Sequence, residues 1–145
     1  MPAKAQPEAQ LDALASLHAR AFTDERPWTA QEFDALLQNP HSFVCATQHA
    51  FALGRAIAGE AELLTIATDP DYIRQGLGRA MLAAFETEAR KRAAVTAFLE
   101  VSSENDAAIG LYTGTGYRVT ATRHAYYSLR NGTRADALIM AKPLA

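Results

Sequence analysis

The segment of the chain best suited to binding chemistry is a glycine pair between two arginines, in the stretch DPDYIRQGLGRA at residues 69–80. Gly76 and Gly78 open a run with helical periodicity, and Arg74 and Arg79 flank them. The first backbone N–H groups of a helix have no partner within it and lie at the positive end of its macrodipole, so glycines there let phosphate oxygens approach closely. The segment therefore predicts a loop that binds a phosphate or diphosphate group.

Two common phosphate-binding motifs fit this loop poorly. A nucleoside-triphosphate P-loop needs Gly-Lys-Ser/Thr, whereas Gly78 is followed by arginine and alanine. A dinucleotide-binding loop would have its third glycine at Met81 and would turn directly off its strand, yet residues 69–75 separate the preceding apolar run from Gly76. Glu100 does lie near the spacing at which that fold binds a ribose. The strands before the loop, however, have the pattern of an antiparallel meander, which disfavours the dinucleotide reading.

A third motif fits better. Gln75, Gly78 and Ala80 follow the Q/R-x-x-G-x-G/A signature, which resembles the diphosphate loop of the Gcn5-related N-acetyltransferases (GNAT). The resemblance extends to LLTIATDPDYIRQGLGRAML, FLEVSSENDAAIGLYTGTGY, YYSLRNGTRADALIMA and PWTAQEF, which are similar to segments of the RimI-like branch, the bacterial ribosomal-protein-alanine N-acetyltransferases. It covers about residues 28–142. One departure is that the family's first strand precedes its first helix, whereas residues 1–10 carry almost no β pattern.

The resemblance implies an α+β fold in three layers, with a mixed, mostly antiparallel central sheet flanked by helices on both faces. In that fold the family's strands 4 and 5 splay apart, and the pantetheine arm of acetyl-coenzyme A (acetyl-CoA) fills the gap. The co-substrate would contact backbone groups of the strand before the loop, the loop itself and the start of a later short helix. According to this resemblance, the residues that bind acetyl-CoA are Ile66, Ala67, Thr68, Arg74, Gln75, Gly76, Leu77, Gly78, Arg79 and Asn105.

The resemblance also implies direct transfer of an acetyl group to an amine. Glu100 matches the general base, acting through water, and Tyr112 matches the general acid near the sulfur. Taken alone, Glu100 has the pattern of a solvated carboxylate at a strand end and Tyr112 that of a packed helix aromatic. The implied acceptor is the α-amine at a protein N-terminus, an alanine of a small-subunit ribosomal protein. The alternatives are a lysine or small-molecule amine as the acceptor, or a non-catalytic coenzyme A sensor.

The elements that must position these residues follow from periodicity. Apolar spacing over residues 11–22 predicts a helix ending near Arg26-Pro27, and Thr29 with Glu32 has the spacing of a capping box that starts a second helix. Trp28 is placed to pack on Phe33 across that cap. The runs SFVCAT, AFALGRAIAG and EAELLTIAT then predict three consecutive antiparallel strands.

The second half of the chain is predicted as helix, strand, helix and two strands. The helix from Gly78 to about Arg92 has an apolar face from which Glu86 is excluded. AVTAFLEV predicts a strand, NDAAIGLYTGTGY a short helix, and Asn131-Gly132 a two-residue turn between the last two strands. Tyr126 and Tyr127 are adjacent in a strand and so face opposite sides; one is expected in the core and the other is a candidate wall of the acceptor site.

Composition limits the class of protein. The 145 residues suit a single domain with residues 1–10 as a flexible leader, and 49% apolar with 21% charged residues is typical of a globular chain. A net charge of −2 argues against nucleic-acid binding, and no apolar run approaches the roughly 20 residues of a membrane span. The start lacks a signal-peptide pattern and Cys45 stands alone, so the cytoplasm is expected. The histidines show no metal-ligand spacing, so no metal is expected, and no feature indicates an oligomeric state.

Overall fold

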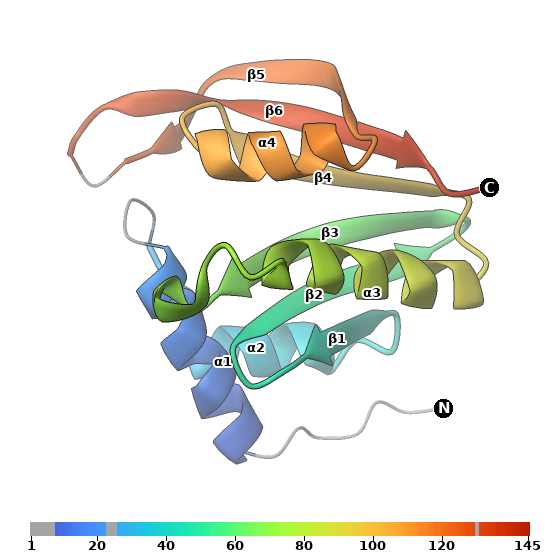
Figure 1. Cartoon of the computed structure of the whole chain (residues 1–145), viewed down its shortest axis with the longest axis horizontal. Helices are drawn as coiled ribbons and strands as arrows, with labels where there is room; N and C mark the ends of the chain where they lie inside the picture. The colour runs from blue at the N-terminus through green and yellow to red at the C-terminus, as the bar shows by residue number, and fades with distance from the viewer. Residues whose placement is uncertain (1–7, 23–25, 130) are drawn as a thin grey trace.

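The computed structural model describes residues 8–22, 26–129 and 131–145 (Figure 1). The predicted order of elements is confirmed, with one short 3₁₀ helix, η1, added between the third strand and the third helix. The elements are α1 (Glu8–Ala21), α2 (Ala30–Leu37), β1 (Ser42–Ala46), β2 (Ala50–Ile57), β3 (Glu60–Thr68), η1 (Pro70–Tyr72), α3 (Leu77–Lys91), β4 (Thr96–Ser102), α4 (Asp106–Gly114), β5 (Arg118–Ser128) and β6 (Arg134–Pro143).

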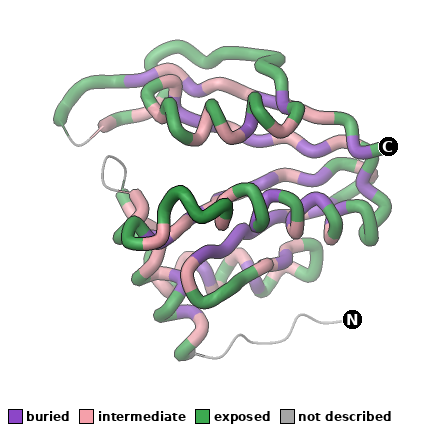
Figure 2. The backbone as a smooth tube through the Cα atoms, in the orientation of Figure 1, coloured by how far each residue is buried: buried purple, intermediate pink, exposed green. Residues whose placement is uncertain are grey.

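The strands form one sheet in the order β1-β2-β3-β4-β6-β5, in which only β3 and β4 run parallel. Helices α1 and α2 pack on one face, where Leu14 and Phe33 share a core with Phe51. Helices α3 and α4 cover the other face, where Phe85 and Leu99 belong to a larger core (Figures 1 and 2). The mixed, mostly antiparallel sheet between two helical layers is the fold class expected from the sequence.

Strands β3 and β4 pair over only part of their length. Their register runs from Glu60–Thr96 to Leu63–Leu99 and ends there, while β4 continues to pair with β6 as far as Ser102. On its other edge β3 has one residue more than β2, because the neighbours Leu53 and Gly54 pair with Thr65 and Leu63. Such a bulge bends and twists a strand, and it lies where the two strands separate. In the described chain, β3 and β4 thus correspond to the family's splayed strands 4 and 5.

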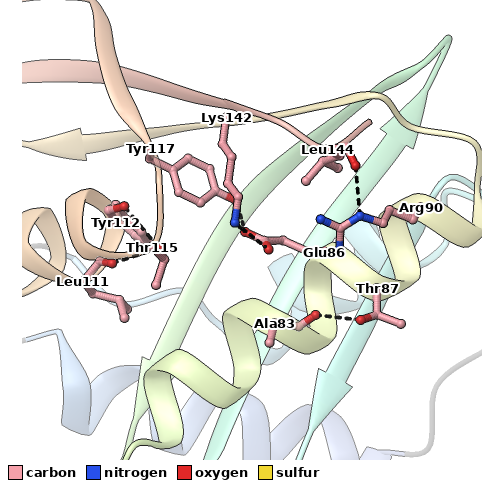
Figure 3. A network of polar contacts seen from close by, with 10 residues as sticks. All are labelled: Ala83, Glu86, Thr87, Arg90, Leu111, Tyr112, Thr115, Tyr117, Lys142 and Leu144. Carbon is pink, nitrogen blue, oxygen red and sulfur yellow. Dashed lines mark hydrogen bonds and ion pairs between the residues drawn. The ribbon is translucent and has the colours of Figure 1, made fainter.

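At the other end of the molecule, buried polar contacts join α3 to the last two strands (Figure 3). Tyr117 donates its hydroxyl proton to Glu86 Oε2 at 2.9 Å, and Lys142 Nζ lies 3.0 Å from Glu86 Oε1. Arg90 Nε also donates to the carbonyl oxygen of Leu144 at 3.1 Å. Glu86 is only 7% exposed. The expectation that Glu86 lies off the packed face of its helix was therefore wrong, because Tyr117, directly before β5, and Lys142 of β6 supply its partners.

Several local expectations are confirmed and three are corrected. Thr29 and Glu32 form the capping box at α2, and the Trp28 and Phe33 rings lie 5.4 Å apart. Helix α1 ends at Ala21 rather than near residues 26–27, and it begins at Glu8, so residues 8–10 are helical while residues 1–7 lie outside the described chain. The turn between β5 and β6 is longer than the predicted two residues, since the Leu129 N–H donates to the Thr133 carbonyl.

Candidate active site

The connection from β3 to α3 is held firmly before it reaches the glycines. The Asp69 side chain accepts the Asp71 N–H at 3.0 Å, and Arg20 of α1 binds both carboxylates at 2.8 Å. Beyond η1 the backbone takes left-handed conformations at Arg74, with φ +64°, and at Gly76, with φ +77°. Gly76 is the N-cap of α3 and brings no side-chain cap. The first N–H groups of α3 therefore face outward without the side chain that caps most helices.

The space around the two glycines fits a bound diphosphate. A methyl group on Gly76 would meet nothing within 4 Å, whereas one on Gly78 would lie 3.4 Å from Leu111 Cδ2 and 3.7 Å from Thr68 Oγ1. The start of α3 is thus packed between the end of β3 and α4, with open space beside Gly76. Open space, uncapped amides and the positive end of a helix together suit an anion. The residues present therefore fit the phosphate part of acetyl-CoA.

A cleft of about 180 Å³ lies where β3 and β4 have separated. Because residues on both faces of the sheet border it, the cleft passes between the two strands. Its lining comprises residues 63–66 of β3, residues 99–102 of β4, Asn105, Ala108 and Tyr112 at and within α4, and His18, Phe22, Trp28 and Tyr127 from the other side. Part of the β3 edge lies free along this cleft, since the described pairing with β4 stops at Leu63.

Glu100 is the carboxylate of the cleft. Its neighbours Leu99 and Val101 point into the core under α3 and α4, so its side chain points to the opposite face, and it is 28% exposed. Its Oε1 atom is buried and has no hydrogen-bond partner in the described chain. Arg123 Nε lies 3.9 Å away, which makes an ion pair beyond hydrogen-bond distance. Buried polar atoms are nearly always bonded, so an unbonded carboxylate oxygen beside a cleft indicates a place for a water or a ligand.

Tyr112 and Asn105 enter the cleft from α4. Tyr112 is 5% exposed, and burial raises the pKa of its phenol above the usual range of a tyrosine. Asn105 is the N-cap of α4 and its Oδ1 accepts the Ala108 N–H at 3.2 Å, which leaves its amide N–H groups to donate elsewhere. The cleft is thus bordered by a protonated phenol, an amide donor and a carboxylate.

The opposite wall is aromatic, and most of it was not predicted from the sequence. His18 of α1 and Phe22, directly after α1, lie four residues apart with rings stacked at 4.2 Å, and Trp28 also stacks on His18 at 5.1 Å. Tyr127 completes this wall from β5, whose pairing with β6 shifts between Arg123 and Tyr127. The only sequence signal for His18 is its i, i+4 spacing to Phe22, which also fits ordinary packing.

Of the adjacent tyrosines, Tyr127 borders the cleft and Tyr126 is 50% exposed. The expectation that one of them lies in the core was therefore wrong, because the helical layers do not extend over this part of the hairpin (Figure 1).

The residues expected to bind the coenzyme fall into three groups. Ile66 and Asn105 border the cleft together with Glu100 and Tyr112. The loop residues stand apart from the cleft lining, at the start of α3: Arg74, Gln75, Gly76 and Arg79 are exposed, and Leu77, Gly78 and Thr68 are half-buried. Ala67 points its side chain into the core under α1 and α2, which leaves only its backbone for a ligand.

Two further features bear on the chemistry. Among the described residues, no cluster of three or more His, Cys, Asp or Glu side chains is arranged to hold a metal ion. Burial and, next, the charge of Glu88 raise the pKa of the Cys45 thiol, which disfavours its use as a nucleophile. No described helix is long and apolar enough to cross a membrane.

A sequence model described as the acetyltransferase (GNAT) family matches residues 10–117. The chain belongs to the GNAT family. Within it, the [ribosomal protein bS18]-alanine N-acetyltransferase of Escherichia coli K12 is 39% identical over 137 residues, which is 92% of each chain. The N-alpha-acetyltransferase RimI of Mycobacterium tuberculosis is 32% identical over 135 residues, covering 87% of this chain and 82% of its own.

A solved structure agrees with these GNAT relatives. The crystal structure of the ribosomal-protein-S18-alanine N-acetyltransferase from Escherichia coli superposes with a TM-score of 0.85 at 36% identity. It covers 98% of this chain and 92% of its own. The GNAT fold inferred from the sequence is therefore confirmed over almost the whole chain.

Proposed function

We propose that this protein is an acyltransferase that moves the acetyl group of acetyl-CoA to the N-terminal α-amine of a protein, an alanine of the small-subunit ribosomal protein that its relatives modify. Similarity across 92% of both chains to an enzyme named for that reaction supports the acceptor. The observation that carries the chemistry is the cleft between β3 and β4, where Glu100 Oε1 is buried without a partner. The whole chain would act as one acetyltransferase domain, in the cytoplasm, with neither nucleic acid nor membrane as a partner.

The donor would lie along the free edge of β3. Backbone groups of residues 66–68 would hydrogen-bond the acetyl and pantetheine parts in the manner of an added strand, and Asn105 would donate from the start of α4. The residues 74–79 would surround the diphosphate, with the outward N–H groups of α3 as its main contacts. The phosphates are held there and take no part in the transfer.

Glu100 would act as the general base and Tyr112 as the general acid. Glu100 accepts the proton of the incoming ammonium through a water, the freed amine forms the new C–N bond, and a backbone N–H near the end of β3 polarises the carbonyl. The C–S bond then breaks, the Tyr112 hydroxyl gives its proton to the departing thiolate, and the phenolate takes the second proton from the attacking nitrogen, which leaves a neutral amide and a free thiol. Burial raises the pKa of Tyr112 and so keeps its phenol protonated at neutral pH, which is the state in which it can donate to the thiolate.

An α-amine is the easier acceptor for such a base. With a pKa near 7.7 to 8.0, making the amine neutral at pH 7 costs about 1 to 1.4 kcal/mol, against about 4.6 kcal/mol for a lysine at 10.4. Glu100, whose side chain borders the cleft and is 28% exposed, can remove a proton more readily from an α-amine than from a lysine. This difference supports α-amine acetylation over lysine acetylation.

Two matched peptides test the proposal. One begins with alanine and contains no lysine; the other has a blocked N-terminus and one internal lysine. We expect thiol release and an added acetyl group, located by tandem mass spectrometry, only with the first peptide. Faster transfer to the lysine would refute α-amine selectivity. Tight binding of acetyl-CoA without transfer to either peptide, or to a panel of small amines, would favour the sensor alternative.

A further inference from the structure

One buried side chain of the cleft has no role in the mechanism above. His18 is 3% exposed and lies between Phe22 and Trp28, with Phe33 edge-on at 5.7 Å. Its Nδ1 accepts the backbone N–H of Trp28 at 3.2 Å, ten residues along the chain. His18 thus binds both the backbone and the ring of Trp28, which stands in the cleft wall between α1 and α2.

The hydrogen bond requires a neutral imidazole. Nδ1 can accept only when it carries no proton, so the ring proton lies on Nε2. Burial lowers the pKa of His18 to about 4; Glu32 opposes this shift and Arg26 adds to it. Those are the charged groups that act on His18, and they bind each other at 2.7 Å. At neutral pH the imidazole therefore stays neutral and keeps its hydrogen bond to Trp28, so this contact is not a pH switch.

We propose that His18 is a positioning residue for the acceptor: it fixes Trp28 as the wall against which the N-terminal residue of the acceptor packs. The inference rests on the proposed function for the identity of the acceptor. Trp28 lies on the same side of the sheet as the Glu100 carboxylate, across the cleft from Tyr112 and the start of α4. A fixed indole there would orient the acceptor amine toward Glu100 without touching the donor.

Trp28 is the single tryptophan of the chain, so its fluorescence reports on this wall directly. The probe is the alanine-starting peptide, titrated into protein saturated with coenzyme A, which binds without turnover. His18→Phe keeps a stacking ring and removes the acceptor of the Trp28 N–H; His18→Asn keeps an acceptor near the Nδ1 position and removes the ring. The exposed His41 provides a matched control, His41→Phe.

We expect His18→Phe to raise the peptide Kd about tenfold, because the part-buried Trp28 N–H loses its partner, and His18→Asn about threefold. Neither variant should change the coenzyme A Kd more than about twofold, and His41→Phe should change nothing. Folding is checked by the thermal unfolding midpoint of each variant. An unchanged peptide Kd in a folded His18→Phe, or equal weakening of peptide and coenzyme, would overturn the inference. Failure of the proposed function would be seen separately, as absence of turnover by the unaltered protein. The fluorescence titration does not depend on turnover.

Discussion

Two carboxylates, Glu86 of α3 and Glu100 of β4, lie at opposite ends of the β3–β4 pair and differ in their hydrogen-bond partners. Glu86, at the paired end, is bonded on both oxygens by Tyr117 and Lys142. Glu100, at the open end, keeps one buried oxygen without a hydrogen bond, and its nearest cation, Arg123, stands 3.9 Å away. A carboxylate with partners on both oxygens holds elements together, whereas a buried oxygen without a partner leaves room for an incoming group. The difference separates a part of the molecule that stabilises the fold from the part where we propose that the reaction occurs.

The largest effect that tests this difference comes from Glu100→Gln. If Glu100 is the general base, turnover should fall between about 10²- and 10⁴-fold with little change in stability. The loss should be greatest near pH 6.5 and smaller near pH 9, because an α-amine with pKa near 8 is by then about nine-tenths neutral. Initial rates of thiol release across this range measure it. A pH profile parallel to that of the unaltered enzyme would remove Glu100 from this role.

Glu86→Ala should show the opposite pattern. Lys142 Nζ, 22% exposed in its side chain, would lose its partner. We expect a loss of about 3 kcal/mol of unfolding free energy, which at this chain length lowers the melting temperature by roughly 6–12 °C. Turnover per folded molecule should change far less than in Glu100→Gln. The triple variant Glu86→Leu, Tyr117→Phe and Lys142→Met removes both charges and the hydroxyl that Glu86 accepts, and it should recover most of the stability. Failure to recover would show that the polar network itself supplies it.

The sequence predicted the helix starts on the coenzyme side better than the aromatic wall on the other side, and coenzyme binding there stays a prediction. Gly76 and Asn105 are the N-caps of α3 and α4, which local patterns encode. Glu100 and Tyr112 were named through resemblance, since alone each matched a commoner structural pattern. The same local patterns gave the element order and the capping box of α2, because these also depend on near neighbours.

What could not be predicted depends on contacts between distant residues. Glu86 has the periodicity of a surface position, and only the approach of Tyr117 and Lys142 makes its burial possible. The role of His18 depends on a hydrogen bond across ten residues, and the place of Tyr127 on an irregularity in the pairing of β5. Periodicity reports which face of an element is apolar, but it does not report which partner arrives there.

His18 adds a third buried titratable group to the comparison, and its effect should be smaller. Its pKa is lowered from 6.5 to about 4 in the folded protein. A lowered histidine pKa means that the unfolded chain binds the proton more readily, so stability is fully present above pH 6.5 and falls as the pH drops toward 4. Between pH 6.5 and 5 we expect a loss of about 1.5 kcal/mol. Denaturant unfolding of the unaltered protein and of His18→Phe measures it; an equal loss in both would assign the slope to other groups.

The smallest expected effect concerns Gly76, at the start of α3, and Gly132, between β5 and β6, which both have a positive φ. Gly76 has φ +77° and Gly132 has φ +85°, and an added methyl group would meet nothing within 4 Å at either position. Alanine at each should therefore cost a similar amount of stability, about 1 kcal/mol, from backbone strain alone. Only Gly76→Ala should also weaken coenzyme A binding in calorimetry, by about fivefold, because its methyl group would enter the space before the α3 amides. Equal coenzyme affinity in the two variants would mean that the diphosphate lies elsewhere, since strain is matched and only the location differs.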